Sequence, residues 1–390
     1  MNDRRLPKLR FKGFKDDWEQ RKAKELCNIG TGKSNTQDQV EDGMYPFYIR
    51  SDVPVKSTKY LYDCEAVITI GDGNIGRVFH YINGKFDLHQ RCYKMTDFQD
   101  ILGKYFYHFF STRFYNRAMI MTAKATVDSV RLEMISEMDI LKPINIEEQR
   151  VIAKLFDEID HLITLHQRKL EKLKIVKKAM LENCFPKNGE KVPKFRFSGF
   201  TGDWEQRKLR DVADIVGGST PSTAISEYWD GDIDWYAPAE ITDQIFVNSS
   251  QKKITTEGLN NSSAKMLPVG TVLFTSRAGI GKTAILTKEG CTNQGFQSII
   301  PHKDELDSYF IFSLTDELKR YGETVGAGST FVEVSGKQMA NMTISIPATM
   351  GEQRQIGTYF RNLDNLITLH QRKLEKLKII KKSFLEKMFV

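Results

Sequence analysis

The chain has 390 residues, of which 40% are hydrophobic and 27% charged, a composition that excludes a disordered or fibrous chain and leaves room for two or three domains. No apolar stretch approaches the roughly 20 residues that a membrane span needs, and the five scattered cysteines form no CxxC pair. We therefore expect a cytoplasmic protein without a disulfide framework or a zinc site, whose net charge of +7 permits, but does not identify, a polyanionic partner.

A short segment near the start, residues 6–22, returns almost unchanged at residues 192–208. The copies read LPKLRFKGFKDDWEQRK and VPKFRFSGFTGDWEQRK and are identical at 12 of 17 positions. We call them the leading segments. Trp18 and Trp204 within them are expected to anchor a core, since a large aromatic ring gains most from burial. A repeat at this separation predicts one structural unit that occurs twice.

The block that follows, residues 23–146, is expected to be of mixed α and β type. EAVITI (65–70) and GRVFHYI (76–82) are predicted strands around a glycine-rich turn, and Asn83-Gly84 is a further hairpin signal. A helix is predicted over residues 100–117 and a small-residue loop over 123–126. The turn formally matches GxGxxG from Gly71 to Gly76, but a strand follows where a dinucleotide site needs a helix. We therefore interpret it as a hairpin turn.

Residues 147–185 are predicted to form one long helix. Asn145 stands at the N-cap position, and Pro186 ends the helix. In the second copy, residues 351–390, Thr349 and Glu352 are placed as a capping box. The stretch LITLHQRKLEKLKI is identical over fourteen residues in the two copies. A helix of roughly 35 residues is about 50 Å long, which suits a spacer.

Both long helices carry apolar residues at alternating spacings of four and three, the period of a coiled coil. A histidine interrupts each pattern, as expected of a polar residue that sets the register at a cost in stability. Antiparallel pairing is expected, since each helix must carry the chain from one block back to the other. Complete overlap would place Ile152 opposite Phe384 and His166 opposite His370. The expected seam residues are Ile152, Phe156, Ile159, Ile163, His166, Leu170, Leu173, Ile356, Phe360, Leu363, Ile367, His370, Leu374 and Leu377.

A linker, residues 186–191, leads to the second leading segment and a second mixed block, residues 209–350. This block is 18 residues longer than the first and shares little sequence with it. Strands are predicted at 271–276 and 282–287, and a helix at 307–322. Gly281-Lys282-Thr283 is similar to the end of a phosphate-binding loop, but the required upstream glycine is Ser276 and a strand follows instead of a helix. We therefore reject a nucleotide site.

Catalytic motifs are not recognisable in the sequence. It lacks the Asn/Asp-Pro-Pro-aromatic motif of base methylation and a Gly-x-Ser-x-Gly motif. Asp160, His161 and His166 lie on one helix among apolar residues and are expected at the seam or on the surface. We predict a chain that is not an enzyme and that binds no metal or cofactor itself.

The segment order closely resembles the specificity (S) subunit of type I restriction–modification enzymes over nearly the whole chain. Its specific part is the duplicated frame of leading segment, variable block, P-x4-E-Q opening and Lys/Leu-rich helix. The resemblance implies an α+β fold with an internal pseudo-two-fold repeat. Two target-recognition domains of mixed α/β type, residues 1–146 and 192–350, would be separated by a long antiparallel two-helix coiled coil, residues 147–185 and 351–390.

The resemblance also implies a function and partners. Each domain of this family reads one half of a bipartite, asymmetric site on double-stranded DNA. The coiled coil sets the distance between the domains and docks modification subunits, here expected to be two, and restriction subunits. S-adenosylmethionine, ATP and Mg²⁺ would belong to those partners, which make the complex an adenine-specific DNA methyltransferase and an ATP-dependent endonuclease around a non-catalytic chain.

Individual base contacts cannot be transferred from the family, because its recognition domains differ by design. Arg, Asn and Gln offer bidentate groups that read guanine and adenine, and Lys holds phosphate, so such residues on the predicted turns and loops are the candidates. A solvated surface role is the alternative for each. For the whole chain the alternatives are a coiled-coil scaffold without DNA contact and a DNA-modifying enzyme with an unrecognised site. The candidate DNA-binding residues are Arg77, Arg91, Lys124, Arg277, Lys282, Asn293, Gln294 and Gln297.

Overall fold

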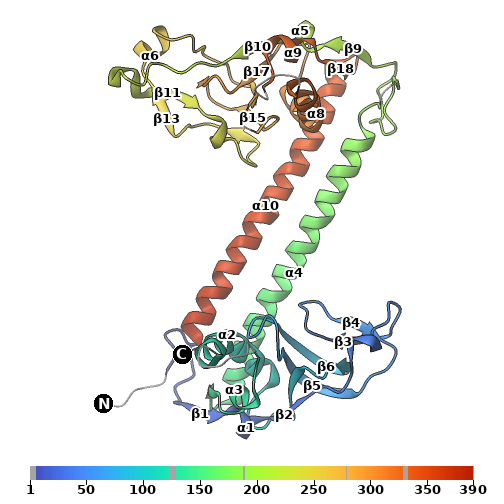
Figure 1. The fold of residues 1–390 in the computed structure, drawn as a ribbon, viewed down its shortest axis with the longest axis vertical. Helices are drawn as coiled ribbons and strands as arrows, with labels where there is room; N and C mark the ends of the chain where they lie inside the picture. The colour runs from blue at the N-terminus through green and yellow to red at the C-terminus, as the bar shows by residue number, and fades with distance from the viewer. Residues whose placement is uncertain (1–5, 123–128, 188, 278, 328–332, 390) are drawn as a thin grey trace. The chain divides into compact units, whose positions relative to one another are not determined.

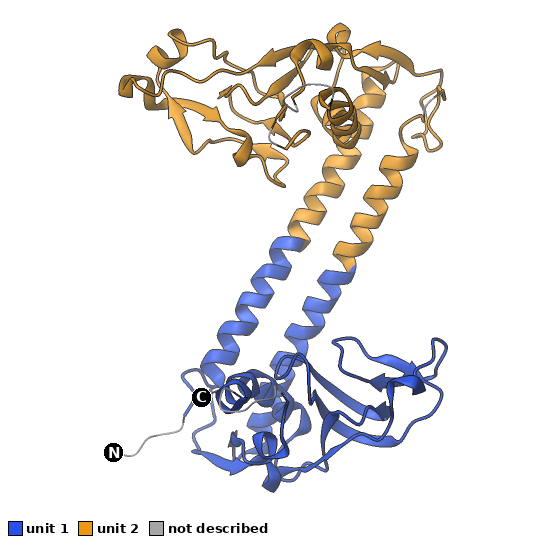
Figure 2. Ribbon diagram, viewed as in Figure 1, with its two compact units in different colours: residues 1–168, 371–390 blue, residues 169–370 orange. Residues whose placement is uncertain are grey.

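The computed structural model describes residues 6–122, 129–187, 189–277, 279–327 and 333–389 (Figure 1). The chain divides into two compact units, residues 1–168 with 371–390 (unit 1) and residues 169–370 (unit 2), which Figure 2 distinguishes by colour. Within the described ranges, none of the helices combines the length and the apolar character that a membrane span requires.

Unit 1 is built on a six-stranded sheet covered by a helix rich in aromatic residues. Its domain consists of α1 (Ala23–Leu26), β2 (Asn28–Thr31), η1 (Thr36–Asp38), β3 (Tyr45–Tyr48), β4 (Val55–Ser57), β5 (Tyr62–Ile70), β6 (Phe79–Leu88), β7 (Cys92–Thr96), α2 (Gly103–Thr122) and α3 (Leu132–Ser136). The strand order is β2-β7-β5-β6-β3-β4. Alternate side chains of β5 enter two cores, because successive residues of a strand point to opposite faces: Val67 joins the core that contains α2, and Ile68 joins the other.

Unit 2 has a five-stranded and a three-stranded sheet. Its domain consists of α5 (Leu209–Val212), β10 (Ala213–Gly217), η2 (Ser226–Tyr228), β11 (Trp229–Tyr236), η3 (Pro238–Glu240), β12 (Phe246–Val247), β13 (Lys252–Ile254), α6 (Thr256–Asn260), β14 (Val272–Phe274), β15 (Thr283–Leu286), β16 (Cys291–Thr292), β17 (Gln297–Pro301), α7 (Ser308–Ser313), α8 (Thr315–Gly326) and α9 (Gly336–Asn341). The strand orders are β10-β17-β14-β15-β12 and β13-β11-β16.

Two local predictions from the sequence are wrong. The helix expected over residues 307–322 is two helices, because Leu314 leaves helical geometry and the Thr315 hydroxyl donates to the carbonyl of Phe312 at 2.5 Å. Asn83-Gly84 is not a turn but lies inside β6, where Gly84 pairs with Cys64 of β5. Pairing of β6 along the length of β5 outweighs the local preference of Asn-Gly for a hairpin.

The glycine-rich segments are hairpin turns, as predicted. Residues 71–78 join the antiparallel strands β5 and β6, and residues 275–282 join β14 and β15 in the same way. The strand expected from residue 76 begins only at Phe79, because Gly76 adopts a φ of +67° within the turn. These turns lead to strands, so neither has the helix that a nucleotide site would need.

The leading segments form the same small framework in each unit. β1 (Trp18–Lys22) pairs antiparallel with β8 (Asp139–Pro143), and β9 (Glu205–Lys208) pairs antiparallel with β18 (Thr343–Ile346). Trp18 and Trp204 are 5% and 4% exposed, as expected of core anchors. Each leading segment therefore pairs with the strand that comes just before a long helix in the chain, α4 (Ile146–Asn183) or α10 (Met350–Met388).

A buried ion pair joins each leading segment to the first turn of a long helix. Arg10 binds Glu148 through two parallel hydrogen bonds of 2.6 and 2.8 Å, and Arg196 binds Glu352 through two bonds of 2.8 Å. The two carboxylates have side-chain exposures of only 0% and 2%. This fork-to-fork geometry supplies the charged partner that a buried carboxylate requires.

The expected N-caps are confirmed, but the capping box is formed only in half. Asn145 accepts a hydrogen bond from the backbone N–H of Glu147 at 2.9 Å, and Thr349 accepts one from that of Glu352 at 3.3 Å. The carboxylate of Glu352 binds Arg196, and it also accepts from the indole N–H of Trp204 at 3.3 Å. The Glu352 carboxylate thus joins the start of α10 to the second leading segment.

The glutamine after each buried glutamate ties the long helix to the domain before it. Gln149 accepts a hydrogen bond from the backbone N–H of Leu102 at 2.9 Å. Gln353 accepts one from that of Asp307 at 3.0 Å and donates to the carbonyl of Glu305 at 2.9 Å. Both residues of the repeated Glu-Gln pair are therefore explained by structure.

The long helices run antiparallel to each other within unit 1. Phe156 of α4 stacks on Phe389, just beyond α10, with ring centroids 5.4 Å apart, and Asp160 binds Lys381 at 2.6 Å. Complete overlap of the helices would place Lys376 level with Asp160, and Lys381 lies five residues further along α10. Both side chains of the ion pair lean toward the N-terminus of their own helix and so toward each other, which lets the pair span this offset. The contact establishes the antiparallel direction, and the exact register, with His166 facing His370, stays a prediction.

The same contacts recur within unit 2 with the roles of the helices exchanged. Phe360 of α10 stacks on Phe185, just beyond α4, at 6.0 Å, and Asp364 binds Lys177 at 2.6 Å. Phe185 also contacts Phe310 of the domain core at 5.6 Å. Each domain core thus receives the end of the helix that belongs to the other copy.

Backbone contacts repeat this exchange. The N–H of Leu9 donates to the carbonyl of Lys387 at 3.0 Å, and that of Phe195 donates to the carbonyl of Asn183 at 2.9 Å. All fourteen expected seam residues are buried or half-buried. Most other residues of the two helices are exposed. The seam residues nearest a domain are buried in its core, whereas those further along, such as Leu170, are half-buried.

Replacing Arg10 with alanine should destabilise the first domain by about 3–5 kcal/mol, because the buried carboxylate of Glu148 would lose its charged partner. The free energy of unfolding of the full chain in urea measures this. The matched control is Arg21→Ala, which removes an exposed pair with Glu25 at 2.6 Å and should change stability little. Equal losses in the two variants would show that burial of the pair is not what matters.

A fragment of residues 1–191 should form a two-fold dimer. It holds the first domain and also Asn183 and Phe185, which make in unit 2 the contacts that Lys387 and Phe389 make in unit 1. Two fragments can therefore satisfy each other through one isologous interface. Sedimentation at micromolar concentration checks the mass, and Phe185→Asp should leave the fragment monomeric. A monomeric parent fragment would mean that the two helix ends are not interchangeable.

Candidate nucleic-acid interface

Four segments of the first domain meet at one end of its sheet. The backbone N–H of Gly71 donates to the carbonyl of Arg91 at 2.7 Å, and that of Gln90 donates to the carbonyl of Ser34 at 2.9 Å. These bonds join the β5–β6 turn, the β6–β7 turn and the segment that follows β2. We call this surface the first loop end, and it comprises residues 32–35, 49–51, 71–78 and 89–91.

The second domain has an equivalent surface held by equivalent bonds. The backbone N–H of Ser276 donates to the carbonyl of Gly295 at 2.8 Å, and that of Ser219 donates to the carbonyl of Thr292 at 2.9 Å. These bonds join the β14–β15 turn, the β16–β17 turn and the segment after β10. The second loop end comprises residues 218–220, 237–240, 275–277, 279–282 and 293–296.

Two glycines allow the backbone segments of the loop ends to approach closely. A Cβ on Gly32 would lie 2.2 Å from the carbonyl oxygen of Leu88, and one on Gly218 would lie 2.1 Å from that of Asn293. Neither approach is compatible with a side chain. The two glycines are 186 residues apart, the same separation as the two leading segments. The sequence therefore held a signal for this constraint.

Two arginines and an aspartate form a charged cluster on the first loop end. Nη1 of Arg91 lies 2.7 Å from one carboxylate oxygen of Asp72, and Nη1 of Arg50 lies 3.2 Å from the other. Burial alone would raise the pKa of Asp72, but the hydrogen bonds from Arg91 and Arg50 outweigh it and lower that pKa. The side chains of Arg91 and Arg50 are 62% and 45% exposed, so the cluster presents guanidinium groups to solvent.

Arg77, another candidate, lies in the same turn region. Its guanidinium carbon is 4.6 Å from the ring centroid of Tyr115, and Nη2 donates to the phenolic oxygen at 2.7 Å. Stacking on an aromatic ring holds a cation in place while leaving its outer face accessible. Lys124, the remaining candidate of the first domain, lies outside the described residues.

The candidates of the second loop end are held by a different set of contacts. Arg277 donates to the carbonyl of Gln294 at 2.8 Å and lies 3.3 Å from the carboxylate of Glu333. The side chain of Gln294 accepts a hydrogen bond from the hydroxyl of Thr220 at 2.5 Å. Asn293 closes its turn by accepting a backbone N–H two residues further on, at 2.8 Å.

The structure does not place Gln297 with the other candidates. It begins β17, where a Cβ added to Gly217 or Gly336 would lie 3.6 or 2.9 Å from its Oε1. Its side chain therefore packs on β10 and α9, away from the turn tips. Lys282 is exposed on the β14–β15 turn. The loop ends thus bring together Arg77 and Arg91 in one unit, and Arg277, Lys282, Asn293 and Gln294 in the other.

Sequence reasoning missed Gln90 and Arg50. Gln90 occupies the turn position that Gln294 holds in the second domain, 204 residues later, which is also the separation of the long helices. Its side chain donates to Asn35 at 2.6 Å and so ties the turn to the segment after the first strand, as Gln294 does. Arg50 had no such signal, because its place follows from the parallel pairing of β3 with β6.

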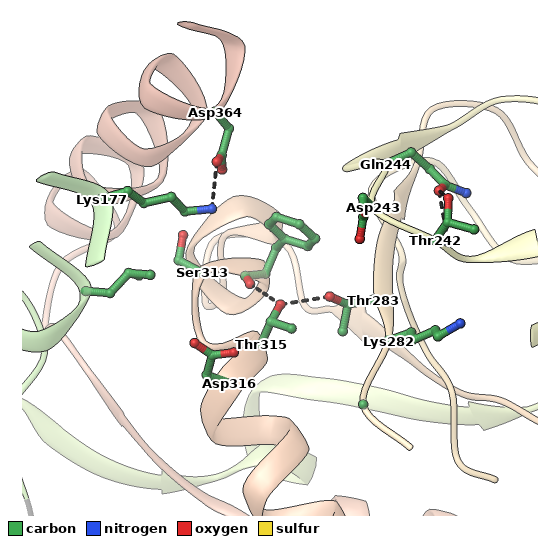
Figure 3. A pocket seen from close by; sticks show the side chains of 13 residues that line it. Lys177, Thr242, Asp243, Gln244, Lys282, Thr283, Ser313, Thr315, Asp316 and Asp364 are labelled. Atoms are coloured by element: carbon green, nitrogen blue, oxygen red, sulfur yellow. Dashed lines mark hydrogen bonds and ion pairs between the residues drawn. The ribbon is translucent and has the colours of Figure 1, made fainter. Parts of the chain in front are cut away.

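A polar cavity of about 250 Å³ lies in unit 2 beside the β14–β15 turn. Figure 3 shows Lys177 reaching Asp364, and Thr283 bonded to Thr315. Asp364 also accepts the phenolic proton of Tyr309 at 2.9 Å, so its carboxylate is engaged on both oxygens. Among the residues that the structure describes, no group of three or more His, Cys, Asp or Glu side chains could hold a metal ion.

The two loop ends carry side chains of the kinds that can bind nucleic acid. They present guanidinium, carboxamide and ammonium groups from rigid turns, and these are the groups that bind base edges and phosphates. The turns are fixed by backbone hydrogen bonds, so their side chains can differ while their shape remains the same. The first loop end has an aspartate between two arginines, whereas the second has an arginine beside a glutamate.

The chain is similar to proteins of one family over most of its length. Residues 15–175 and 201–379 match the family described as the type I restriction modification DNA specificity domain. The two matched regions coincide with the two copies of the internal repeat.

Known specificity subunits are similar to this chain over part of its length. It is 36% identical over 192 residues to the type I restriction enzyme MjaIX specificity subunit of Methanocaldococcus jannaschii, which covers 48% of this chain and 44% of that protein. It is 28% identical over 178 residues to the EcoR124I/EcoR124II specificity subunit of Escherichia coli, with 43% of each chain covered. In these comparisons the chain spans less than half of the relative's length.

The fold is also similar to a solved structure. The S subunit of a type I restriction-modification system from M. genitalium matches with a TM-score of 0.72, covering 99% of both chains at 14% sequence identity. At this identity the likeness concerns the fold alone.

Replacing Gly32 with alanine should lower the thermal unfolding midpoint of the full chain by several degrees. The new Cβ would collide with the carbonyl of Leu88, and overpacking of this kind costs about 1–3 kcal/mol. Gly30→Ala, two residues earlier in β2, is the control, since its Cβ would meet nothing nearer than Lys94 Nζ at 4.0 Å. An unchanged midpoint for Gly32→Ala would contradict the close approach of the two segments.

Proposed function

Because the chain belongs to the family of type I restriction–modification DNA specificity domains, we propose that it is the DNA-reading subunit of a type I restriction–modification complex. Each domain reads one half of a bipartite site on double-stranded DNA through its loop end. The observation that carries this proposal is the construction of the loop ends, which share their backbone turns and differ in the side chains displayed.

The two half-sites should differ in sequence. The N–H of Val130 donates to the carbonyl of Gly71 at 2.7 Å, and that of Val334 donates to the carbonyl of Ser276 at 2.9 Å, so the residues that follow, Asp72 and Arg277, are equivalent. A carboxylate and a guanidinium at one position favour opposite hydrogen-bonding partners. The proposed site is therefore asymmetric.

Modification subunits, two of them, and restriction subunits are the proposed partners. Both long helices expose large apolar side chains that their own unit does not cover, with exposures between 37% and 67%. Because equivalent positions of both helices are involved, the surface suits two copies of one partner. These exposed residues are Leu162, Leu165 and Ile175 in α4 and Leu366, Leu369 and Ile379 in α10.

Catalysis is assigned to the partners. S-adenosylmethionine would be bound by the modification subunits, and ATP and Mg²⁺ by the restriction subunits. The role proposed for this chain is to bind DNA and to position those subunits on it, and the ion pairs and turns of the loop ends serve binding only.

Exchanging residues 23–146 for the equivalent block of another family member should change one half of the DNA site and leave the other half unchanged. The contacts of separate domains are roughly additive, because each domain touches its own base pairs. Sequencing of methylated adenines, in a host that lacks other methylases and expresses the modification subunit, reads out the site. Exchange of residues 209–350 is the matched control and should change the other half. A simultaneous change of both halves by either exchange would contradict independent reading.

A further inference from the structure

The charged cluster of the first loop end has a composition that points to a particular base pair. We propose that Asp72 orients Arg91 and Arg50 for reading a G·C pair in the first half-site, with Arg91 contacting the guanine. Asp72 acts as a positioning residue and Arg91 as the reading residue. The inference rests on the proposed function of the loop ends.

The backbone places Asp72 and Arg91 next to each other independently of their side chains. The N–H of Gly71 donates to the carbonyl of Arg91 at 2.7 Å, which locks the two turns together. The N–H of Arg91 donates to Nδ1 of the buried His89 at 3.1 Å, and the backbone of Asp72 bridges to Ser129. Both residues therefore project from fixed points.

The carboxylate restricts where the guanidinium of Arg91 can point. An exposed arginine otherwise samples many rotamers, and that freedom is lost when it binds a base. Asp72 holds Nη1 of Arg91 at 2.7 Å and is itself only 20% exposed. The side chain of Arg91 is 62% exposed, and its guanidinium keeps its other N–H groups for a ligand. Two such donors match the O6 and N7 acceptors of guanine.

The aspartate also distinguishes a base edge from a phosphate as the ligand. A carboxylate within hydrogen-bonding distance of both arginines would repel a phosphate brought to the same guanidinium groups. A base edge is neutral and carries no such cost. The cluster is thus complementary to the guanine edge of a G·C pair rather than to a phosphate.

The second loop end lacks this arrangement and serves as an internal comparison. Arg277 stands at the position of Asp72, and Gly295, whose carbonyl accepts the equivalent turn bond, stands at the position of Arg91. A G·C contact of this kind is therefore expected in the first half-site only.

The test uses the full chain assembled with its modification subunits and maps methylated adenines in a host without other methylases. Arg91→Ala should reduce the preference for guanine at one position of the first half-site roughly ten- to hundredfold, and the second half-site should not change. Asp72→Asn should relax the same position several-fold, and adding it to Arg91→Ala should have little further effect. Arg91→Lys keeps the charge without the bidentate fork and should also lose the preference.

The control variants are Arg21→Ala and Glu25→Gln, which break an ion pair of 2.6 Å before β2, and they should leave the recognised site unchanged. Thermal unfolding of each variant separates a folding defect from a change in reading. Uniformly weaker methylation of all sites by Arg91→Ala, together with a shallower salt dependence of DNA binding, would show a phosphate contact and overturn the inference. An unchanged site would also overturn it. If the domain exchange still moves the first half-site, the proposed function survives that outcome.

Discussion

Two buried carboxylates, Glu148 and Glu352, fix where each long helix begins relative to its domain. A carboxylate without access to water is tolerated only beside a charged hydrogen-bonding partner, and arginines supply that partner from 138 and 156 residues earlier in the chain. Leading segment, final strand and helix start are thereby joined into one framework around each variable block. The framework explains the uneven identity of the repeat. The leading segments agree at 12 of 17 positions, and each of them binds the start of one long helix and the end of the other, whereas the blocks between them are free to diverge.

In the loop ends, as in the framework, the contacts that fix the backbone are separate from the side chains that vary. Their turns are joined by hydrogen bonds between backbone groups, and two close approaches are made possible by glycine. Neither kind of contact depends on the side chains at the turn tips. Position 72 and its equivalent, position 277, can therefore carry opposite charges on nearly the same backbone. A recognition surface built in this way can acquire a new preference by substitution at a few exposed positions, while the sheet below and the framework behind it remain intact.

Much of the fold could be predicted from the sequence, because local signals and distant contacts agree there. The helix caps and the hairpin turn between β5 and β6 belong to this group. Predictions failed where a distant contact outweighed a local one. Asn83-Gly84, for example, lies inside the long pairing of β5 with β6 instead of forming a turn. Candidate residues such as Arg91 and Gln294 could be named because they lie on predicted turns, and Gln90 could have been found from the repeat, 204 residues before Gln294. Arg50 lies in the candidate site because β3 pairs in parallel with β6, and no local sequence pattern predicts that pairing.

The repeat is not exact where the helix ends dock, and this bears on why two copies are joined in one chain. Arg113 donates to the carbonyl of Phe389, where a cation is favoured by the unpaired carbonyls of a helix C-terminus. The position 204 residues later is Glu317, a half-buried acid whose pKa is raised by burial. The accepting group is a backbone carbonyl, which either helix end can offer, so this difference lies in the two domains and not in the helix ends. Because both copies lie in one chain, each can change separately. The two loop ends can therefore differ, and each framework can adapt to the domain that it holds.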